Sequence, residues 1–268
     1  MGPASESAPS QAPPGLSGIL SAGLDIFPAL TTFSGHRLRS RWQPMSPLSP
    51  TLYRLCRGLL RHTWARLHPL RVEGLEHLPS LGPAILCPKH QRWEDILTVA
   101  LALPPDLHFI AKAELFTIPG QREFLRALGG VPVDRQNPRA TLSSFRQLLP
   151  LFQQKAYVVL FPEGTYVRSG VGPGKHRLVQ MILKLQGKNG LGPIPFVPLG
   201  IRYEPRPRSS TWGVTVRVGP PLAGSEAGRA PGFTQDIMAA IARLCQGSEK
   251  PGEASLKPGR RVLSPEYR

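Results

Sequence analysis

The stretch Ile85-Leu-Cys-Pro-Lys-His-Gln-Arg-Trp-Glu-Asp95 separates two short apolar runs. Pro88 ends the first run and the second follows at 96–101, so the pattern is typical of a strand, a turn and a helix. His90 and Asp95 lie in the polar segment between them. Because α/β proteins place their chemistry in the loops after the carboxyl ends of strands, we expect a functional site here.

Around this stretch, short apolar segments alternate with segments of helical spacing from residue 72 to residue 246. This alternation predicts an α/β fold with a mixed, largely parallel sheet flanked by helices. Pro150 is expected to fray the last turn of the helix predicted over Arg139–Gln154. The predicted strands are Ala84–Cys87, Leu107–Ala111, Val131–Val133, Tyr157–Phe161, Phe196–Tyr203 and Thr211–Val218, and the predicted helices are Glu94–Leu103, Gln121–Leu128, Arg139–Gln154, Lys175–Gln186 and Thr234–Gln246.

A basic amphipathic helix is predicted in front of this domain, over Pro50–Leu67 within the segment 47–71. Such a helix either binds a membrane surface or docks its apolar stripe on the domain while its arginines face water, and both alternatives stay open. The stripe is Tyr53, Cys56, Leu60, Trp64 and Leu67, and the arginines on another face are Arg54, Arg57 and Arg61.

The two ends of the chain, residues 1–46 and 247–268, are rich in proline, glycine and small polar residues. We expect both to lack a fixed fold. Neither a signal peptide nor a membrane-spanning segment is expected, because no basic segment precedes an apolar core and the early apolar stretch is interrupted by polar residues and proline.

Charge and cysteine content restrict the class of partner and site. Lys and Arg outnumber Asp and Glu by 33 to 17, giving a formal net charge of +16, which favours an anionic partner such as nucleic acid, acidic lipid or a phosphorylated substrate. Cys56, Cys87 and Cys245 lie far apart and form no CxxC pair. The sequence therefore indicates neither a disulfide framework nor a zinc site, and we expect a reducing compartment and no bound metal.

Three polar clusters each follow a predicted strand: His90–Asp95, Asp134–Arg135 and Glu163–Thr165. In a sheet with parallel neighbours, the ends of these strands meet at one edge. The clusters would then combine a base and its carboxylate, an arginine for an anion and a carboxylate in a glycine-containing turn. Each cluster alone is more often structural, but the three together favour a site.

Four sequence blocks in order resemble those of the glycerophospholipid acyltransferases, most closely the 1-acyl-sn-glycerol-3-phosphate type. The blocks are His90-x4-Asp95, Gly129–Arg135, Phe161-Pro-Glu-Gly-Thr165 and Val197-Pro-Leu-Gly-Ile201, within roughly residues 70–220. The resemblance implies an acyltransferase domain, here placed at residues 72–246.

The resemblance also implies a role for each matching residue. His90 would be the general base on the acceptor hydroxyl, and Asp95 would orient its imidazole. A separation of five does not place two side chains on one helical face, so we expect His90 in the turn and Asp95 in the first helical turn. Arg135 would bind the acceptor phosphate, and the segment Glu163-Gly164-Thr165 would help to form the acceptor pocket. No metal or redox cofactor is implied.

The function that the resemblance implies is transfer of a fatty acyl chain from acyl-CoA or acyl-carrier protein to a lysophospholipid, with lysophosphatidic acid giving phosphatidic acid as the leading case. We expect a peripheral protein at the cytoplasmic face of a membrane, with no nucleic-acid partner. Another lysolipid or glycerol-3-phosphate is an alternative acceptor. A non-catalytic basic module for lipid or nucleic acid would explain the charge, but not the four blocks.

Four positions depart from the family pattern. Lys89 stands where Asn is usual, Arg92 where Ser is usual, and Glu94 where a hydrophobic residue is usual. Tyr166 stands where an arginine commonly follows the third block, so one expected phosphate ligand is missing. Arg168, Lys175 and Lys89 are candidates to replace that charge. The departures leave the acyl-transfer residues intact and affect the acceptor headgroup.

Overall fold

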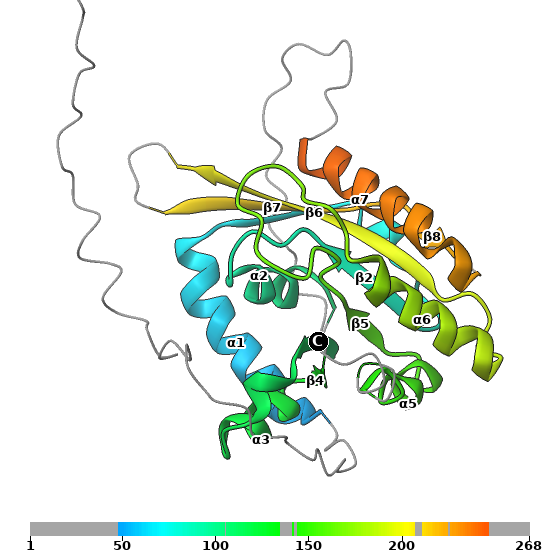
Figure 1. The fold of residues 1–268 in the computed structure, drawn as a ribbon. Helices are drawn as coiled ribbons and strands as arrows, with labels where there is room; N and C mark the ends of the chain where they lie inside the picture. The colour runs from blue at the N-terminus through cyan, green and yellow to red at the C-terminus, as the bar shows by residue number, and fades with distance from the viewer. Residues whose placement is uncertain are drawn as a thin grey trace, which may run out of the picture. The chain divides into compact units, whose positions relative to one another are not determined.

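The computed structural model describes residues 48–104, 106–134, 141, 144–206, 211–224 and 226–246. These residues form an eight-stranded sheet in the order β1-β7-β6-β2-β5-β3-β4, with β8 paired to β6 (Figure 1). All pairings are parallel except those of β6 with β7 and β8. The strands are β1 (Leu70–Glu73), β2 (Ala84–Pro88), β3 (Leu107–Lys112), β4 (Gly130–Val133), β5 (Tyr157–Val159), β6 (Pro195–Pro205), β7 (Trp212–Val218) and β8 (Leu222–Ala223).

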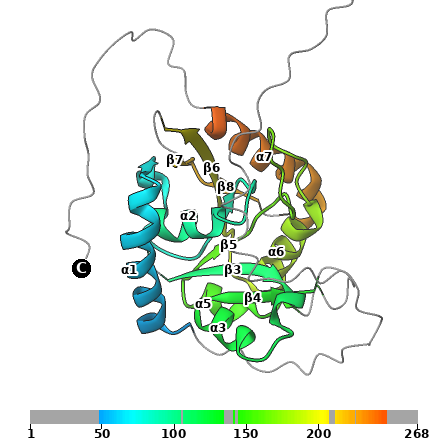
Figure 2. The same ribbon diagram turned by 90° about the vertical axis from the view of Figure 1, so that its left-hand side faces the viewer.

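Helices cover both faces of the sheet, with α1 and α2 on one side and α6 and α7 on the other (Figure 2). The predicted fold class, a largely parallel mixed sheet flanked by helices, is therefore confirmed. The helices are α1 (Pro50–Leu67), α2 (Asp95–Ala102), α3 (Gln121–Ala127), α5 (Leu148–Gln153), α6 (His176–Asn189) and α7 (Ala230–Gln246), with short 3-10 helices η1 (Leu75–His77), η2 (Ala113–Phe116) and η3 (Ala227–Arg229).

Strand β2 lies in the middle of the sheet and is buried along its whole length. Successive side chains of a strand point to opposite faces. Ile85 and Cys87 accordingly pack in the core beneath α5, α6 and α7, whereas Ala84 and Leu86 pack in the core beneath α2. An apolar run without alternation is what a central parallel strand requires, and it fixes where the polar segment after Pro88 begins.

The predicted helix over 139–154 is helical in most of its described residues, but it is broken into two segments. Arg146 and Gln147 form a turn, and a separate short helix, α5, begins at Leu148. Pro150 lies in the first turn of α5, where a missing N–H needs no partner, rather than in the last turn of a longer helix. The proline thus marks the start of a helix, and the longer amphipathic pattern spans two segments.

Helix α1 has the bounds that the sequence predicts, and Ser49 caps it by accepting a hydrogen bond from the Leu52 N–H at 3.4 Å. Most of its apolar stripe docks on the domain, with Tyr53 buried and Trp64 half-buried, whereas Leu67 at its end is exposed. The prediction that Arg57 faces water was wrong, because its guanidinium donates to the Leu103 carbonyl at 2.7 Å, at the end of α2. Arg54 and Arg61 are exposed.

The predictions for residues 1–46 and 247–268 lie outside the described residues. Among the helices of the described ranges, none combines the length and the apolar content that crossing a bilayer requires. Strand β1 pairs with β7 from Leu70 onward, so the sheet begins two residues before the predicted boundary at residue 72.

Gly200 explains the glycine of the fourth sequence block and gives a test of the packing. A Cβ at this position would lie 2.6 Å from the Leu244 carbonyl carbon and 2.9 Å from the Cys245 nitrogen, both backbone atoms of α7. We expect Gly200→Ala to push α7 from β6 and to destabilise the fold by about 1–3 kcal/mol, as overpacking does. Urea unfolding monitored by circular dichroism measures this.

Gly187 is the matched control, since it lies inside α6 and a Cβ there meets nothing within 4 Å. Gly187→Ala should leave stability unchanged or raise it by up to about 1 kcal/mol through helix propensity. Equal effects of the two substitutions would contradict the close approach of β6 and α7.

Candidate active site

The first and third polar clusters meet at the carboxyl ends of β2 and β5, which are parallel neighbours. The backbone N–H of His90 donates to the Glu163 carboxylate at 2.7 Å. Asp134 follows β4, which is parallel to β3 and thus ends at the same edge. The expected convergence of the three strand ends is therefore present in the topology, while Arg135 itself lies outside the described residues.

His90 lies in the turn after β2, and Asp95 is the first residue of α2, as the spacing predicts. His90 Nδ1 lies 3.1 Å from Asp95 Oδ2. The imidazole stacks on Phe161, with ring centroids 3.9 Å apart, and is tilted against Tyr166 at 4.4 Å. Asp95 is fully buried, whereas the His90 side chain keeps a small exposed surface. The ring is thus fixed on one side and accessible on another.

The Asp95 carboxylate accepts three further hydrogen bonds. The N–H groups of Gln91 and Arg92 donate to Oδ2 at 2.6 and 2.8 Å, and the Tyr203 hydroxyl donates to Oδ1 at 2.8 Å. Burial, and then the charge of Asp95, raises the pKa of Tyr203, so its hydroxyl keeps its proton at neutral pH. Tyr203 was not among the predicted site residues, because it lies 108 positions from Asp95 and belongs to none of the four blocks.

This arrangement assigns the protons of the pair. An ionised carboxylate only accepts, so the Asp95 contact places the imidazole proton on Nδ1 and leaves Nε2 able to take a proton. Burial raises the pKa of the Cys87 thiol, and chiefly burial raises that of Cys245. These two thiols stay protonated and are poor nucleophiles. The geometry is therefore compatible with the predicted role of His90 as a base, which stays a prediction, and makes neither cysteine a good nucleophile.

Lys89 and Glu163 form a buried ion pair next to His90. The two residues are only 2% and 1% exposed, and Lys89 Nζ donates to the two Glu163 oxygens at 2.9 and 3.0 Å. The same ammonium donates to the Val167 carbonyl at 2.7 Å, and Glu163 also accepts from the Gly172 N–H at 2.8 Å. The pair thus ties the His90 turn to the loop that follows β5.

The Lys89–Glu163 pair bears on the missing phosphate ligand. Lys89 is enclosed and neutralised, so of the three candidate replacements only Arg168 and Lys175 present exposed side chains. Gly164 has a φ of +67°, a left-handed conformation that suits glycine in the turn, and Thr165 is exposed. The acceptor-binding roles of Glu163, Gly164 and Thr165 stay predictions.

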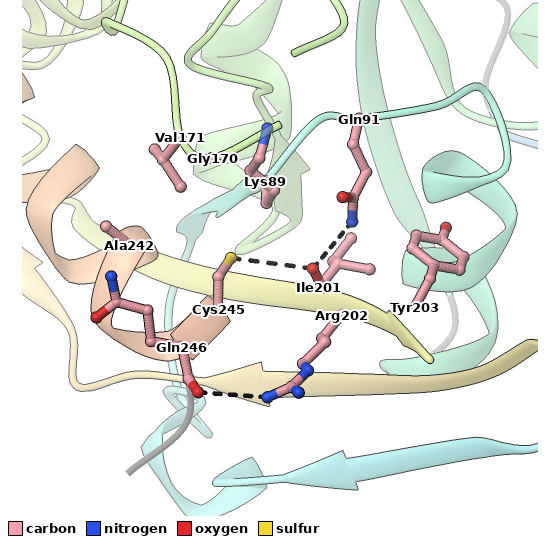
Figure 3. A pocket seen from close by; sticks show the side chains of 10 residues that line it. All are labelled: Lys89, Gln91, Gly170, Val171, Ile201, Arg202, Tyr203, Ala242, Cys245 and Gln246. Atoms are coloured by element: carbon pink, nitrogen blue, oxygen red, sulfur yellow. Dashed lines mark hydrogen bonds between the residues drawn. The ribbon is translucent and has the colours of Figure 1, made fainter. Parts of the chain in front are cut away.

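A cavity of about 310 Å³ lies beside the site, between β6, α7 and the loop after β5 (Figure 3). Lys89 and Gln91 are among the residues that line it, and His90 is not. Gln91 points across it and donates to the Ile201 carbonyl at 2.9 Å. That bond anchors the turn that carries His90 to β6. The other residues that line the cavity are Gly170, Val171, Ile201, Arg202, Tyr203, Ala242, Cys245 and Gln246.

The fold and the His90–Asp95 pair, with Asp95 buried and His90 half-buried, define an α/β protein with a His–Asp site at the carboxyl ends of its strands. A family model described as Acyltransferase matches residues 69–202, half of the chain. The chain belongs to this Acyltransferase family. The match begins with β1 and ends within β6, so it contains the His90 turn, the Glu163 turn and the first part of β6.

Similar proteins include a chloroplastic 1-acyl-sn-glycerol-3-phosphate acyltransferase of Arabidopsis thaliana, 32% identical over 50% of this chain and 36% of the relative. The 1-acyl-sn-glycerol-3-phosphate acyltransferase of Bacillus subtilis is 30% identical over 42% of this chain and 57% of the relative. The matched part of the chain thus spans 36% of the length of the first of these relatives and 57% of the length of the second. The crystal structure of the 1-acyl-sn-glycerophosphate acyltransferase of Thermotoga maritima has the same fold, with a TM-score of 0.51, 24% identity, and coverage of 69% of this chain and 76% of that one.

The buried Lys89–Glu163 pair predicts a strong effect of removing one partner. In Lys89→Met the Glu163 carboxylate stays buried without its cation, so we expect a loss of about 3–5 kcal/mol in the free energy of unfolding. Adding Glu163→Gln should restore part of that loss, since the unpaired charge is gone. A urea double-mutant cycle measures both effects.

The exposed pair Arg229–Glu226, at 3.3 Å, provides the control. Arg229→Met should leave the unfolding midpoint unchanged, because solvent screens such pairs. If Lys89→Met behaved like Arg229→Met, the pair would not hold the turn together.

Proposed function

We propose that this protein transfers a fatty acyl chain from acyl-CoA or acyl-carrier protein to the free hydroxyl of lysophosphatidic acid, forming phosphatidic acid. The observation that carries the proposal is the contact of the His90 imidazole with the buried Asp95 carboxylate through Nδ1, beside the Glu163 turn. The family and the 1-acyl-sn-glycerol-3-phosphate acyltransferases among its relatives support it.

In this reaction His90 Nε2 takes the proton of the acceptor hydroxyl as its oxygen attacks the thioester carbon. The new ester C–O bond forms and the C–S bond breaks, and the thiolate leaving group takes the proton from the imidazolium. Asp95 stabilises that transient cation through the Nδ1–H contact at 3.1 Å. The proton that His90 takes from the hydroxyl is replaced by the one it gives to the thiolate, so His90 returns to its starting state. This bond exchange uses no metal or redox cofactor.

The acceptor site is proposed on the same edge. Arg135 would bind the acceptor phosphate with two hydrogen bonds from its planar guanidinium, and Glu163-Gly164-Thr165 would shape the pocket. A different lysolipid or glycerol-3-phosphate is the second candidate acceptor. Tyr166, at the position of a common phosphate-binding arginine, makes the acceptor headgroup the part of the proposal that the substrate panel must decide.

Peripheral attachment to the cytoplasmic face of a membrane is part of the proposal. The net charge of +16 favours anionic lipid, and acyl-bearing substrates partition into bilayers. Helix α1 carries exposed Arg54, Arg61, Leu55 and Leu59, so its predicted role at a membrane surface remains a proposal, and whether it lies flat or meets the bilayer by one end is a separate question. A non-catalytic basic module would need neither the His90–Asp95 pair nor its four-fold bonded carboxylate.

The test of the reaction is purified protein with labelled acyl-CoA and a panel of lysolipids and glycerol-3-phosphate, read by product identity. Phosphatidic acid should be the main product from the wild type. His90→Ala should lower turnover at least about a hundredfold, the scale of general-base catalysis, while the circular dichroism spectrum is unchanged.

His62→Ala is the matched control, since His62 lies exposed on α1 and bonds only the Gly58 carbonyl of its own helix. It should retain full turnover. Normal turnover by His90→Ala would exclude the mechanism, and a product other than phosphatidic acid would replace the leading acceptor while keeping the chemistry.

Tyr203 gives a prediction for a positioning residue. Tyr203→Phe removes a hydrogen bond to a buried charge, worth about 1.5–3 kcal/mol, and loosens Asp95 behind the imidazole. We expect kcat to fall about tenfold or more with little change in the acceptor KM, and the pH profile of kcat to move. Steady-state kinetics across pH measures this.

Tyr157→Phe is its control, because the Tyr157 hydroxyl bonds the Pro79 carbonyl at the start of β5, away from the site. It should change stability only. Equal losses of kcat in the two variants would mean that Tyr203 acts through the fold alone.

A further inference from the structure

Exposed apolar side chains gather around the catalytic turn. The carboxyl ends of β2, β5 and β6 point to one edge of the sheet, and antiparallel β7 begins beyond it. We call this the active-site edge. Exposed large apolar residues near the His90 turn at this edge include Leu67 at the end of α1, Trp93 in the turn itself, Ile96 in the first turn of α2, Tyr166 after the Glu163 turn and Trp212 at the start of β7.

Aromatic contacts link these residues to one another and to the site. Trp64 lies 6.4 Å from Trp93 and stacks on His68 at 4.0 Å, measured between ring centroids. His68 Nδ1 in turn lies 3.3 and 3.4 Å from the backbone oxygen and nitrogen of Trp212. Three of the four tryptophans therefore belong to one cluster, and Trp42 lies outside the described residues.

A cation lies within the cluster. The Arg92 guanidinium stands over the ring of Tyr203 at 4.5 Å and over that of Trp212 at 5.5 Å. Within the described part of the chain, Arg92 forms no ion pair with a carboxylate, and the nearby Asp95 is buried and occupied by other donors. The charge thus remains for an external anion, in a position where the family usually has a serine.

Tryptophan beside a basic side chain matches the headgroup region of an anionic bilayer, where amphipathic rings and phosphates meet. A protein partner would also cover apolar surface, but it would block the edge at which substrates reach His90. A bilayer instead supplies acyl-bearing substrates there. The chemistry of the edge therefore favours lipid as its occupant.

We propose that the active-site edge docks on the surface of an anionic phospholipid bilayer, with Trp93, Trp212 and Leu67 entering the headgroup layer and Arg92 binding lipid phosphate. This rests on the proposed function only in naming lipid as the substrate-bearing phase. It specifies an orientation in which α1 meets the membrane by its C-terminal end, rather than lying flat on it.

The course of α1 makes the two orientations distinct. The helix begins near α3, where the Ser49 N–H donates to the Ala127 carbonyl, and ends beside Trp93 and Trp212 (Figure 1). Its middle therefore lies away from the active-site edge. Leu55 and Leu67 are similarly exposed, at 68% and 56%, but only Leu67 lies at this edge.

The test measures how much of the full chain sediments with vesicles made of equal parts phosphatidylglycerol and phosphatidylcholine, without substrate. It compares the variants Leu67→Glu and Leu55→Glu. Leu67→Glu places a negative charge in the anionic headgroup layer, so it should weaken vesicle binding at least about tenfold. Leu55→Glu lies outside that layer and should weaken binding less than about threefold. A larger loss for Leu55→Glu, or equal losses, would overturn the proposed orientation.

Tryptophan fluorescence provides a measurement that needs no edge variant. In a Trp42→Phe background, phosphatidylcholine brominated on its acyl chains and mixed into the same vesicles should quench emission, and Leu81→Ala should bind and quench alike. Leu81 is 84% exposed and precedes β2 at the opposite edge. Absence of quenching in vesicle-bound protein would overturn the proposal.

The same vesicle measurement separates docking from catalysis. His90→Ala should sediment and quench like the wild type, because His90 adds little surface. If no acyl acceptor were turned over by the wild type while quenching persisted, the proposed function would fail and the docking surface would stand.

Discussion

His90 is fixed from two sides by buried carboxylates, and the arrangement of the site depends on this constraint. Glu163 accepts its backbone N–H at 2.7 Å, and Asp95 lies 3.1 Å from its ring nitrogen. A buried carboxylate is tolerated only when its oxygens are bonded, so each one collects further donors from distant segments. Glu163 collects Lys89 and the Gly172 N–H, and Asp95 collects two turn N–H groups and Tyr203. The hydrogen bonds that satisfy the two buried carboxylates are therefore the same ones that hold the segments of the site together.

The sequence was sufficient for those parts of the fold that follow from local periodicity. The apolar run before Pro88 and the helical spacing of α1 gave the right element types and nearly the right ends. It missed the break in the helix predicted over 139–154, because an apolar spacing of three and four continues across the turn at Arg146 and only the backbone shows that a second helix begins at Leu148. Arg57 was misplaced since a guanidinium can reach inward to cap a neighbouring helix, a contact that periodicity does not encode.

For the site, the spacing of five between His90 and Asp95 was enough to place one residue in the turn and the other in the helix. Tyr203 and the partner of Lys89 were not accessible in the same way. Tyr203 reaches Asp95 only because β6 extends past the end of β2, and Lys89 meets Glu163 only because β2 and β5 are neighbours. Such contacts depend on strand order, which a single sequence does not specify.

The departures at Lys89 and Arg92 have different physical consequences. Lys89 faces inward, where its ammonium neutralises Glu163 and bonds the Val167 carbonyl, so it stabilises the turn and adds no charge to the surface. Arg92 has its backbone N–H engaged by Asp95, while its side chain lies over two aromatic rings of β6 and β7. The residue whose backbone N–H orients the carboxylate thus also presents a cation beside His90. Because both contacts arise from one residue of the turn, an anion bound at Arg92, as proposed, would be coupled to the geometry of the His90–Asp95 pair.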